Sequence, residues 1–231
     1  MITVETIRER HSVREYDGKP LSRAEFDALG AVVEEYARES GLDIQLVGDN
    51  PEVFNVIARF GLIRGCRTHV AFVVDDGKAR GVAADEAIGY WGQKIVFTAQ
   101  DMGLNTCWCA LCSRRKSRAV VVPGKKIRLV IAVGHGKTQG FSRKTKSVEA
   151  LSSVECAKAP AWFAAAMEAA QLAPTAMNNQ NFKITLLSDG KTVRIDAPKS
   201  GLNVIDEGIV RCNFEIAASE AGADWRWERD I

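Results

Sequence analysis

The chain has 231 residues, of which 46% are hydrophobic and 26% are charged, a balance that supports an ordinary hydrophobic core. A net charge of +2 is too small to indicate binding to nucleic acid or to a membrane surface. The longest apolar runs are strand-sized, and the N-terminus lacks the basic start and apolar stretch of a secretory signal. Six cysteines without such a signal favour free thiols, so we expect a cytoplasmic α+β protein.

The first part of the chain alternates helical and strand patterns. In chain order it predicts a helix at 3–9, a helix at 22–38, a strand at 44–47, a helix opened by Pro51, a strand at 69–74, a helix at 85–102 and a strand at 127–133. Ser22 and Glu25 form a capping box at the start of the second helix. Gly103 follows the long helix in the manner of a helix C-cap.

The second part begins with a polar, basic region at 136–146 that has no apolar period. We expect this region to be a surface connection. After it the sequence predicts a helix at 159–172, a hairpin of strands at 183–187 and 192–195, and a helix at 206–221.

The two long helices indicate an internal repeat. Asp85-Glu86-Ala-Ile88 corresponds to Asp206-Glu207-Gly-Ile209 at their starts, and both helices end at a glycine. Two amphipathic helices with glycine stops also arise without duplication. The repeat nevertheless predicts two related halves at 1–146 and 147–231, which together form one compact unit and cover each other's hydrophobic faces.

Arg10, Ser12 and Arg14 place two guanidinium groups and a hydroxyl within five residues. In an extended chain these three side chains point to one side. Arginine forks match the oxygens of a phosphate, so the pattern suits a phosphate site. Taken alone, the pattern is more often that of a solvated basic turn than that of a phosphate site.

The loop from Ala173 to Gln180 lies between a predicted helix and a predicted strand. Pro174 ends the helix, and Thr175, Asn178 and Gln180 present hydroxyl and amide groups. Such a loop suits a polyol chain or the edge of a heterocycle. It is also an ordinary helix-to-strand turn.

Cys107, Cys109 and Cys112 follow the long helix at C-x-C-x2-C spacing. A zinc or iron–sulfur site usually has a fourth ligand at a recognisable spacing, and none is nearby. The remaining cysteines are scattered along the chain: Cys66, Cys156 and Cys212. We expect no metal and no redox pair here, only small, partly buried residues at a helix end.

In this order the motifs resemble the FMN-dependent nitroreductase family over nearly the whole chain. That family has R-x-S-x-R after a short helix, as at Arg10–Arg14, and G-L-G-T-C-W after a long helix, as at Gly103–Trp108. It has a loop like A-P-S-x-x-N-x-Q, as at Ala173–Gln180, and a strand ending in G-Y-P before a basic stretch, as at Gly134–Lys144. The resemblance implies an α+β nitroreductase-like fold, with antiparallel-rich sheets flanked by helices.

One departure from the family concerns the order of the motifs. The A-P-S-like loop usually follows the first amphipathic helix, but here it follows the helix at 159–172 in the second half. Family members are homodimers with the flavin between subunits, so the chain resembles a fused, pseudo-dimeric branch with one complete site. This implies a monomer, with a homodimer as the alternative. Asn105, Asn181 and Phe182 also replace usual family residues and leave the substrate open.

The resemblance implies that FMN is the cofactor and that a defined set of residues binds it. Arg10 and Ser12, with Arg143 or Lys144, would hold the phosphate, and Arg14 would lie near the pyrimidine end of the ring. The full set of implied cofactor-binding residues is Arg10, His11, Ser12, Arg14, Trp108, Cys109, Ala110, Arg143, Lys144, Thr175, Asn178 and Gln180.

The implied activity is reduction of the flavin by NAD(P)H, followed by transfer to a nitroaromatic, quinone or related small acceptor. This ping-pong cycle requires no side-chain acid or base. One alternative is a specialised relative that dehalogenates a substrate or fragments flavin. Two others are a flavin-binding protein without reductase activity and an interaction module.

Overall fold

The computed structural model describes residues 2–55, 63–77, 82–155 and 158–229. The chain divides into two compact units. One, called the sheet unit here, comprises Arg10–Arg80 and Ile95–Ser142, and the other, called the helical unit, comprises Met1–Glu9, Gly81–Lys94 and Arg143–Ile231. These units group the segments differently from the predicted halves 1–146 and 147–231, and the duplication stays a prediction.

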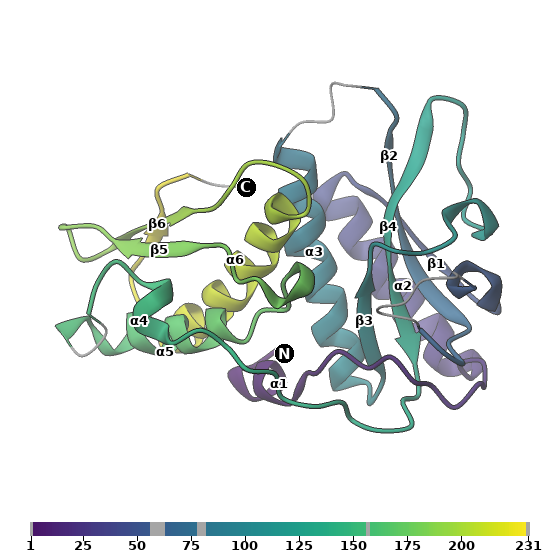
Figure 1. Ribbon diagram of the computed structural model, residues 1–231, viewed down its shortest axis with the longest axis horizontal. Coiled ribbons are helices and arrows are strands. Elements are labelled where there is room, and N and C mark those ends of the chain that lie inside the picture. The colour runs from purple at the N-terminus through teal and green to yellow at the C-terminus, as the bar shows by residue number, and fades with distance from the viewer. Residues whose placement is uncertain (1, 56–62, 78–81, 156–157, 230–231) are drawn as a thin grey trace. The chain divides into compact units, whose positions relative to one another are not determined.

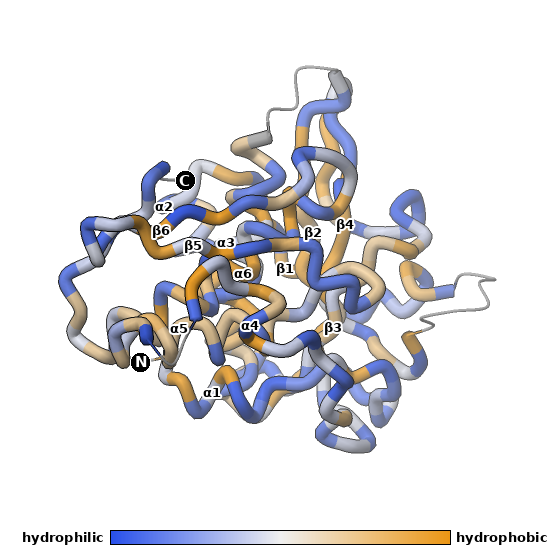
Figure 2. Tube along the Cα trace, turned by 60° about the vertical axis from the view of Figure 1, so that its left-hand side comes forward, coloured by the Kyte–Doolittle hydropathy of each residue, from blue (hydrophilic) through white to orange (hydrophobic). Residues whose placement is uncertain are grey.

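The sheet unit is built on a four-stranded antiparallel sheet in the order β1-β2-β4-β3 (Figure 1). Its elements are α2 (Arg23–Ser40), β1 (Asp43–Val47), the 3-10 turn η1 (Pro51–Phe54), β2 (Thr68–Asp75), the end of α3 (Val82–Asp101), β3 (Asn105–Cys109), the 3-10 turn η2 (Arg114–Lys116) and β4 (Lys125–Gly134). The hydrophobic colouring of β2 and β4 in Figure 2 agrees with their almost continuous burial at the centre of this sheet.

Helix α2 shows why the predicted boundaries hold. Ser22 N donates to Glu25 Oε2 at 2.8 Å and Glu25 N donates to Ser22 Oγ at 3.3 Å, which confirms the capping box. Gly41 ends the helix in the left-handed region at φ 69°. The apolar side of α2 packs against β1.

Two predictions in the sheet unit need correction. The Cys107–Cys109 segment is not simply a helix end but part of β3, whose Thr106 and Trp108 lie opposite Val133 and Ile131 of β4. Pro51 opens the 3-10 turn Pro51–Phe54 instead of an α-helix, and residues 56–62, which come after it, lie outside the described residues.

The helical unit contains the second, three-stranded sheet in the order β5-β6-β7. Its elements are α1 (Val4–Glu9), the first part of α3, α4 (Val148–Leu151), α5 (Ala161–Gln171), the 3-10 turn η4 (Ala176–Asn178), β5 (Lys183–Leu186), β6 (Thr192–Asp196), α6 (Asn203–Glu220) and β7 (Arg226–Trp227). The predicted hairpin is antiparallel, and β7, which the sequence did not predict, pairs parallel to β6.

Helices α3 and α6 approach each other through two glycines. A Cβ on Gly89 would lie 2.0 Å from Ile205 O, and a Cβ on Gly208 would lie 1.9 Å from Glu86 O. Both obstructing atoms are backbone atoms, so neither can rotate away. The crossing therefore requires glycine at both positions.

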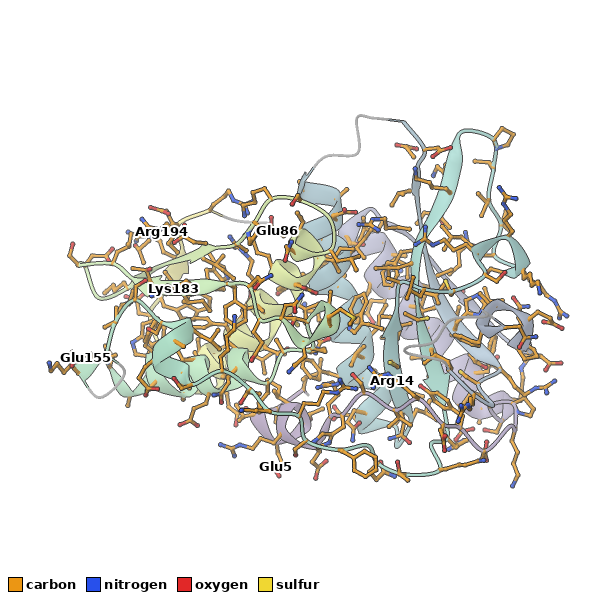
Figure 3. The ribbon with its side chains drawn as sticks, in the orientation of Figure 1. Glu5, Arg14, Glu86, Glu155, Lys183 and Arg194 are labelled. Carbon is orange, nitrogen blue, oxygen red and sulfur yellow. The ribbon has the colours of Figure 1, made fainter. Side chains whose placement is uncertain are left out.

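A buried ion cluster lies beside this crossing. Glu86, labelled in Figure 3, and Glu207 have fully buried side chains. Arg211 Nε lies 2.9 Å from Glu86 Oε1, and Arg229 Nη2 lies 2.7 Å from Glu86 Oε2 and 3.2 Å from Glu207 Oε1. Lys199 also pairs with Glu207. The arginines and the lysine thus compensate two carboxylates that would otherwise be costly to bury.

We predict that Gly208→Ala lowers the free energy of unfolding by about 3 kcal/mol or more, because the added methyl group meets backbone. Gly30→Ala is the matched control, because Gly30 lies inside helix α2 and a Cβ there would meet only Leu46 Cδ2, at 3.8 Å. This control should stabilise the protein by about 0.5–1 kcal/mol. Urea unfolding of both variants measures the difference, and equal midpoints would contradict the close crossing.

Candidate functional site

The segment Arg10–Arg14 lies along β3 within the sheet unit. Val13 N donates to Thr106 O at 3.0 Å, and Ser12 forms a parallel bridge with Thr106. Because β3 is the last strand of its sheet, its open edge is available to this segment. Two motifs that are far apart in the sequence therefore lie side by side, and Arg14 is labelled on this segment in Figure 3.

Alternation along the segment separates its apolar and polar side chains. Val13 is buried in the sheet unit's apolar cluster, whereas Ser12 and Arg14 are half-buried. Arg10 is the most deeply buried of the three, with 9% of its surface exposed. Burial lowers the pKa of Arg10 to about 10, and the nearby Cys107 opposes this shift. The guanidinium stays charged at neutral pH, so an anionic ligand would offset its burial.

The chain after β4 packs against the same segment. His11 Nε2 lies 3.2 Å from Ser142 Oγ, and a Cβ on Gly140 would lie 2.6 Å from the His11 Cβ. Asn105 Oδ1 accepts from Gly136 N at 2.9 Å, and Asn105 Nδ2 donates to Gln139 Oε1 at 2.8 Å. Asn105, which replaces the usual glycine of the family motif, therefore holds the segment after β4 against the start of β3.

Trp108, Cys109 and Ala110 stand at the end of β3. The Trp108 ring is half-buried and stacks on Phe72, with ring centroids 6.0 Å apart and 14° between the ring planes. Arg114 Nη2 donates to Ala110 O at 3.0 Å, which holds the turn after the strand. These contacts fix the backbone whose groups the resemblance implies near a flavin ring.

In the helical unit, the loop from Thr175 to Gln180 is folded by its own polar side chains. Gln180 N donates to Thr175 Oγ1 at 3.0 Å, Gln180 Nε2 donates to Gln171 O at 2.9 Å, and Lys146 N donates to Gln180 Oε1 at 2.7 Å. Gln180 is 1% exposed. We therefore assign its side chain a positioning role, which the sequence could not distinguish from direct contact with a ligand.

The basic stretch and this loop are joined in the same unit. Asn178 Nδ2 donates to Lys144 O at 2.8 Å, while the side chains of Arg143 and Lys144 are exposed. Met177 and Asn178 adopt left-handed φ angles of 54° and 57° at the tip of the loop. Such angles are uncommon outside glycine, so the loop depends on these hydrogen bonds to keep its shape.

Asp206, which the sequence indicated only as part of a helix start, contacts the loop after α5. Both of its carboxylate oxygens lie 3.0 Å from Ala176 N, which donates to them. Burial raises the pKa of Asp206 to about 7, although the bond from Ala176 lowers it. The first turn of α6 thus anchors the loop through a carboxyl group that titrates near neutrality.

We predict that Asp206→Asn stabilises the protein at high pH. The folded pKa is above the unfolded value of about 3.9, so the stability that Asp206 contributes is greatest below that value and is lost as pH rises through about 7. Asparagine stays neutral and keeps one acceptor for Ala176 N. Urea unfolding should show a gain of up to about 4 kcal/mol at pH 8 that shrinks toward pH 5. A gain independent of pH would contradict this assignment.

None of the described cysteines forms a disulfide: Cys66, Cys107, Cys109, Cys112 and Cys212. Cys156 lies outside the described residues. No group of three or more His, Cys, Asp or Glu side chains in the described part of the chain is arranged to hold a metal ion. Cys109-Ala-Leu-Cys112 has C-x-x-C spacing, which the expectation of no redox pair did not take into account.

Comparison with known proteins now decides the family. The model of the family described as "Putative TM nitroreductase" matches residues 2–218. The chain belongs to this family. Among curated proteins no match is found. None of the helices in the described ranges combines the length and the apolar character needed to cross a bilayer.

Solved structures of nitroreductases share the fold. A "putative nitroreductase" from Thermotoga maritima is 19% identical with a TM-score of 0.69, covering 100% of this chain and 90% of its own. A "putative nitroreductase in complex with FMN" from Desulfovibrio desulfuricans is 18% identical with a TM-score of 0.51, covering 66% of this chain and 95% of its own. A nitroreductase family protein from Streptococcus pneumoniae is 12% identical with a TM-score of 0.52, covering 66% and 98%. The predicted nitroreductase-like α+β fold is confirmed.

Proposed function

We propose that this nitroreductase family member is an FMN-dependent oxidoreductase that transfers reducing equivalents from NAD(P)H to a small acceptor. The observation that carries the proposal is the Arg10–Arg14 segment, held against β3 with a buried guanidinium next to a half-buried hydroxyl. Family membership and the fold shared with a nitroreductase described in complex with FMN support the same cofactor.

The phosphate end of FMN fits the chemistry of this segment. Arg10 and Ser12 would donate to the phosphate oxygens, and charge-assisted bonds of this kind are the stronger class of hydrogen bond. Arg143 or Lys144 would add a further cation, since both side chains are exposed. His11, between Arg10 and Ser12 in the sequence, would be held in place by its contact with Ser142 Oγ.

The remaining residues of the predicted set would contact the isoalloxazine ring or the ribityl chain. Arg14 would bring positive charge to the pyrimidine end, where it stabilises negative charge on the ring. The backbone of Trp108, Cys109 and Ala110 would face the ring. Thr175 and Asn178, in the loop positioned by Gln180, would contact the ring edge or the ribityl chain.

The chain's own residues bind and orient in this proposal and do not transfer protons. When bound, FMN would supply the hydride chemistry between NADH or NADPH and a nitroaromatic, quinone or related acceptor. One chain contains one R-x-S-x-R segment and one A-P-T loop, so we propose one FMN per chain and a monomeric enzyme. The free thiols agree with the cytoplasm as its location.

We predict that Arg10→Met weakens FMN binding by about tenfold to a hundredfold, because it removes a charge-assisted phosphate contact. The FMN affinity of Arg10→Lys should fall between those of wild type and Arg10→Met, because lysine keeps the positive charge but lacks the two-pronged guanidinium. Arg8→Met is the control, because Arg8 is an exposed residue of α1 paired with Glu5. Quenching of flavin fluorescence measures each dissociation constant, after circular dichroism has shown that each variant is folded. An unchanged affinity in Arg10→Met would contradict the phosphate assignment.

Turnover is tested by mixing the FMN-loaded protein with NADH or NADPH without oxygen and following the flavin's visible absorbance. Bleaching, followed by recovery when a quinone or nitroaromatic is added, supports the oxidoreductase. Stable FMN binding without bleaching by either nicotinamide would indicate a flavin-binding protein and overturn the proposed reaction.

A further inference from the structure

Two cysteines lie close together where the chain leaves β3. Cys109 is the last residue of β3 and Cys112 comes three residues later, and each thiol shifts the pKa of the other. Cys109 is buried, Cys112 is half-buried, and Leu111 between them is 66% exposed. The pair therefore lies near the surface of the sheet unit, and Cys112 is its more exposed member.

The surroundings make the two sulfurs unequal. The hydrogen bond from Cys109 lowers the pKa of Cys112 against the opposing effect of burial, and the Arg114 guanidinium lowers it further. Arg114 is fixed on the turn by its bond to Ala110 O. The same contact with Cys112, followed by burial, raises the pKa of Cys109, whose sulfur also lies 3.2 Å from Leu111 O. Cys112 is thus the more acidic of the two thiols and the better nucleophile.

The other two thiols of this unit's apolar cluster are in different environments. Cys66 and Cys107 are both buried. Cys66 donates to the carbonyl oxygens of Thr68 and Val133, and burial raises its pKa to about 12. A buried protonated thiol is a poor nucleophile, so Cys66 is a weaker candidate for reaction than the half-buried Cys112.

We propose that Cys109 and Cys112 are a redox-active dithiol that reacts reversibly with small disulfides. The Cys112 thiolate attacks one sulfur of R–S–S–R, which forms a mixed disulfide on Cys112 and releases one RS⁻. Cys109 then attacks the Cys112 sulfur, closes the Cys109–Cys112 disulfide and expels the second RS⁻, which takes the proton that Cys109 gives up. The dithiol is oxidised, the small disulfide is reduced to two thiols, and the reverse steps restore the protein.

This activity goes beyond the proposed flavin reaction and does not require FMN. The separation of three residues and the mutual effect of the two thiols on their pKa values place the cysteines near each other, as a disulfide requires. A protein that fails to bind FMN would still form the disulfide, so the two proposals fail separately.

The test treats the native protein with glutathione disulfide at neutral pH and follows intact mass and alkylation of the remaining thiols. We expect wild type to lose two hydrogens and two of its six thiols, with a peptide map joining Cys109 to Cys112. Cys109→Ser should accumulate glutathione on Cys112, and Cys112→Ser should stay unreacted. Cys107→Ser, the control, should close like wild type. A peptide map in which both thiols of the pair stay alkylated would overturn the proposal whatever the variants do.

Arg114 provides a second readout that does not alter a cysteine. Arg114→Met should slow the reaction with glutathione disulfide several-fold at neutral pH and less at alkaline pH, where the thiolate forms without its help. Arg115→Met is the matched control, because Arg115 is an exposed neighbour in the same turn η2. Equal rates in both arginine variants would contradict the role given to Arg114.

Discussion

The contact between the Arg10–Arg14 segment and the open edge of β3 is the constraint on which the sheet unit's chemistry depends. The hydrogen bond from Val13 to Thr106 aligns the two chains, so alternation places Val13 in the core and leaves Ser12 and Arg14 partly accessible. The same strand ends at Cys109 and leads into the turn that carries the second thiol. The segment thereby covers an edge that could otherwise pair with another chain.

In the helical unit, the close crossing of α3 and α6 is the constraint that positions the loop after α5. The two glycines allow the helices to meet, and the ion cluster around Glu86 and Glu207 compensates the charges buried beside them. The first turn of α6 then presents Asp206 to the backbone of the loop after α5. The shape of that loop is therefore set by helix packing as well as by its own side chains.

The sequence predicted the long helices and the central strands because their signals are strong and local. Ser22 and Glu25 mark a helix start, and residues 127–133 form a nearly continuous apolar run. Strand β3 was missed because its five residues have no distinct pattern and depend on pairing with β4. The sequence could not predict that the Gln180 side chain bonds within the protein or that Asp206 anchors the loop after α5. Both depend on residues that come close only when the chain folds. The spacing of Cys109 and Cys112 was visible in the sequence, but their place at the end of a strand depends on the pairing of β3 with β4.

We propose that each chain binds one FMN, because the R-x-S-x-R segment and the A-P-T loop each occur once in the sequence. A titration of the purified protein with FMN, read by flavin fluorescence at protein concentrations well above the dissociation constant, counts these sites directly. The account predicts saturation at about one FMN per chain, as expected for a single tight site. Saturation at two per chain, or no binding at tens of micromolar FMN, would contradict it.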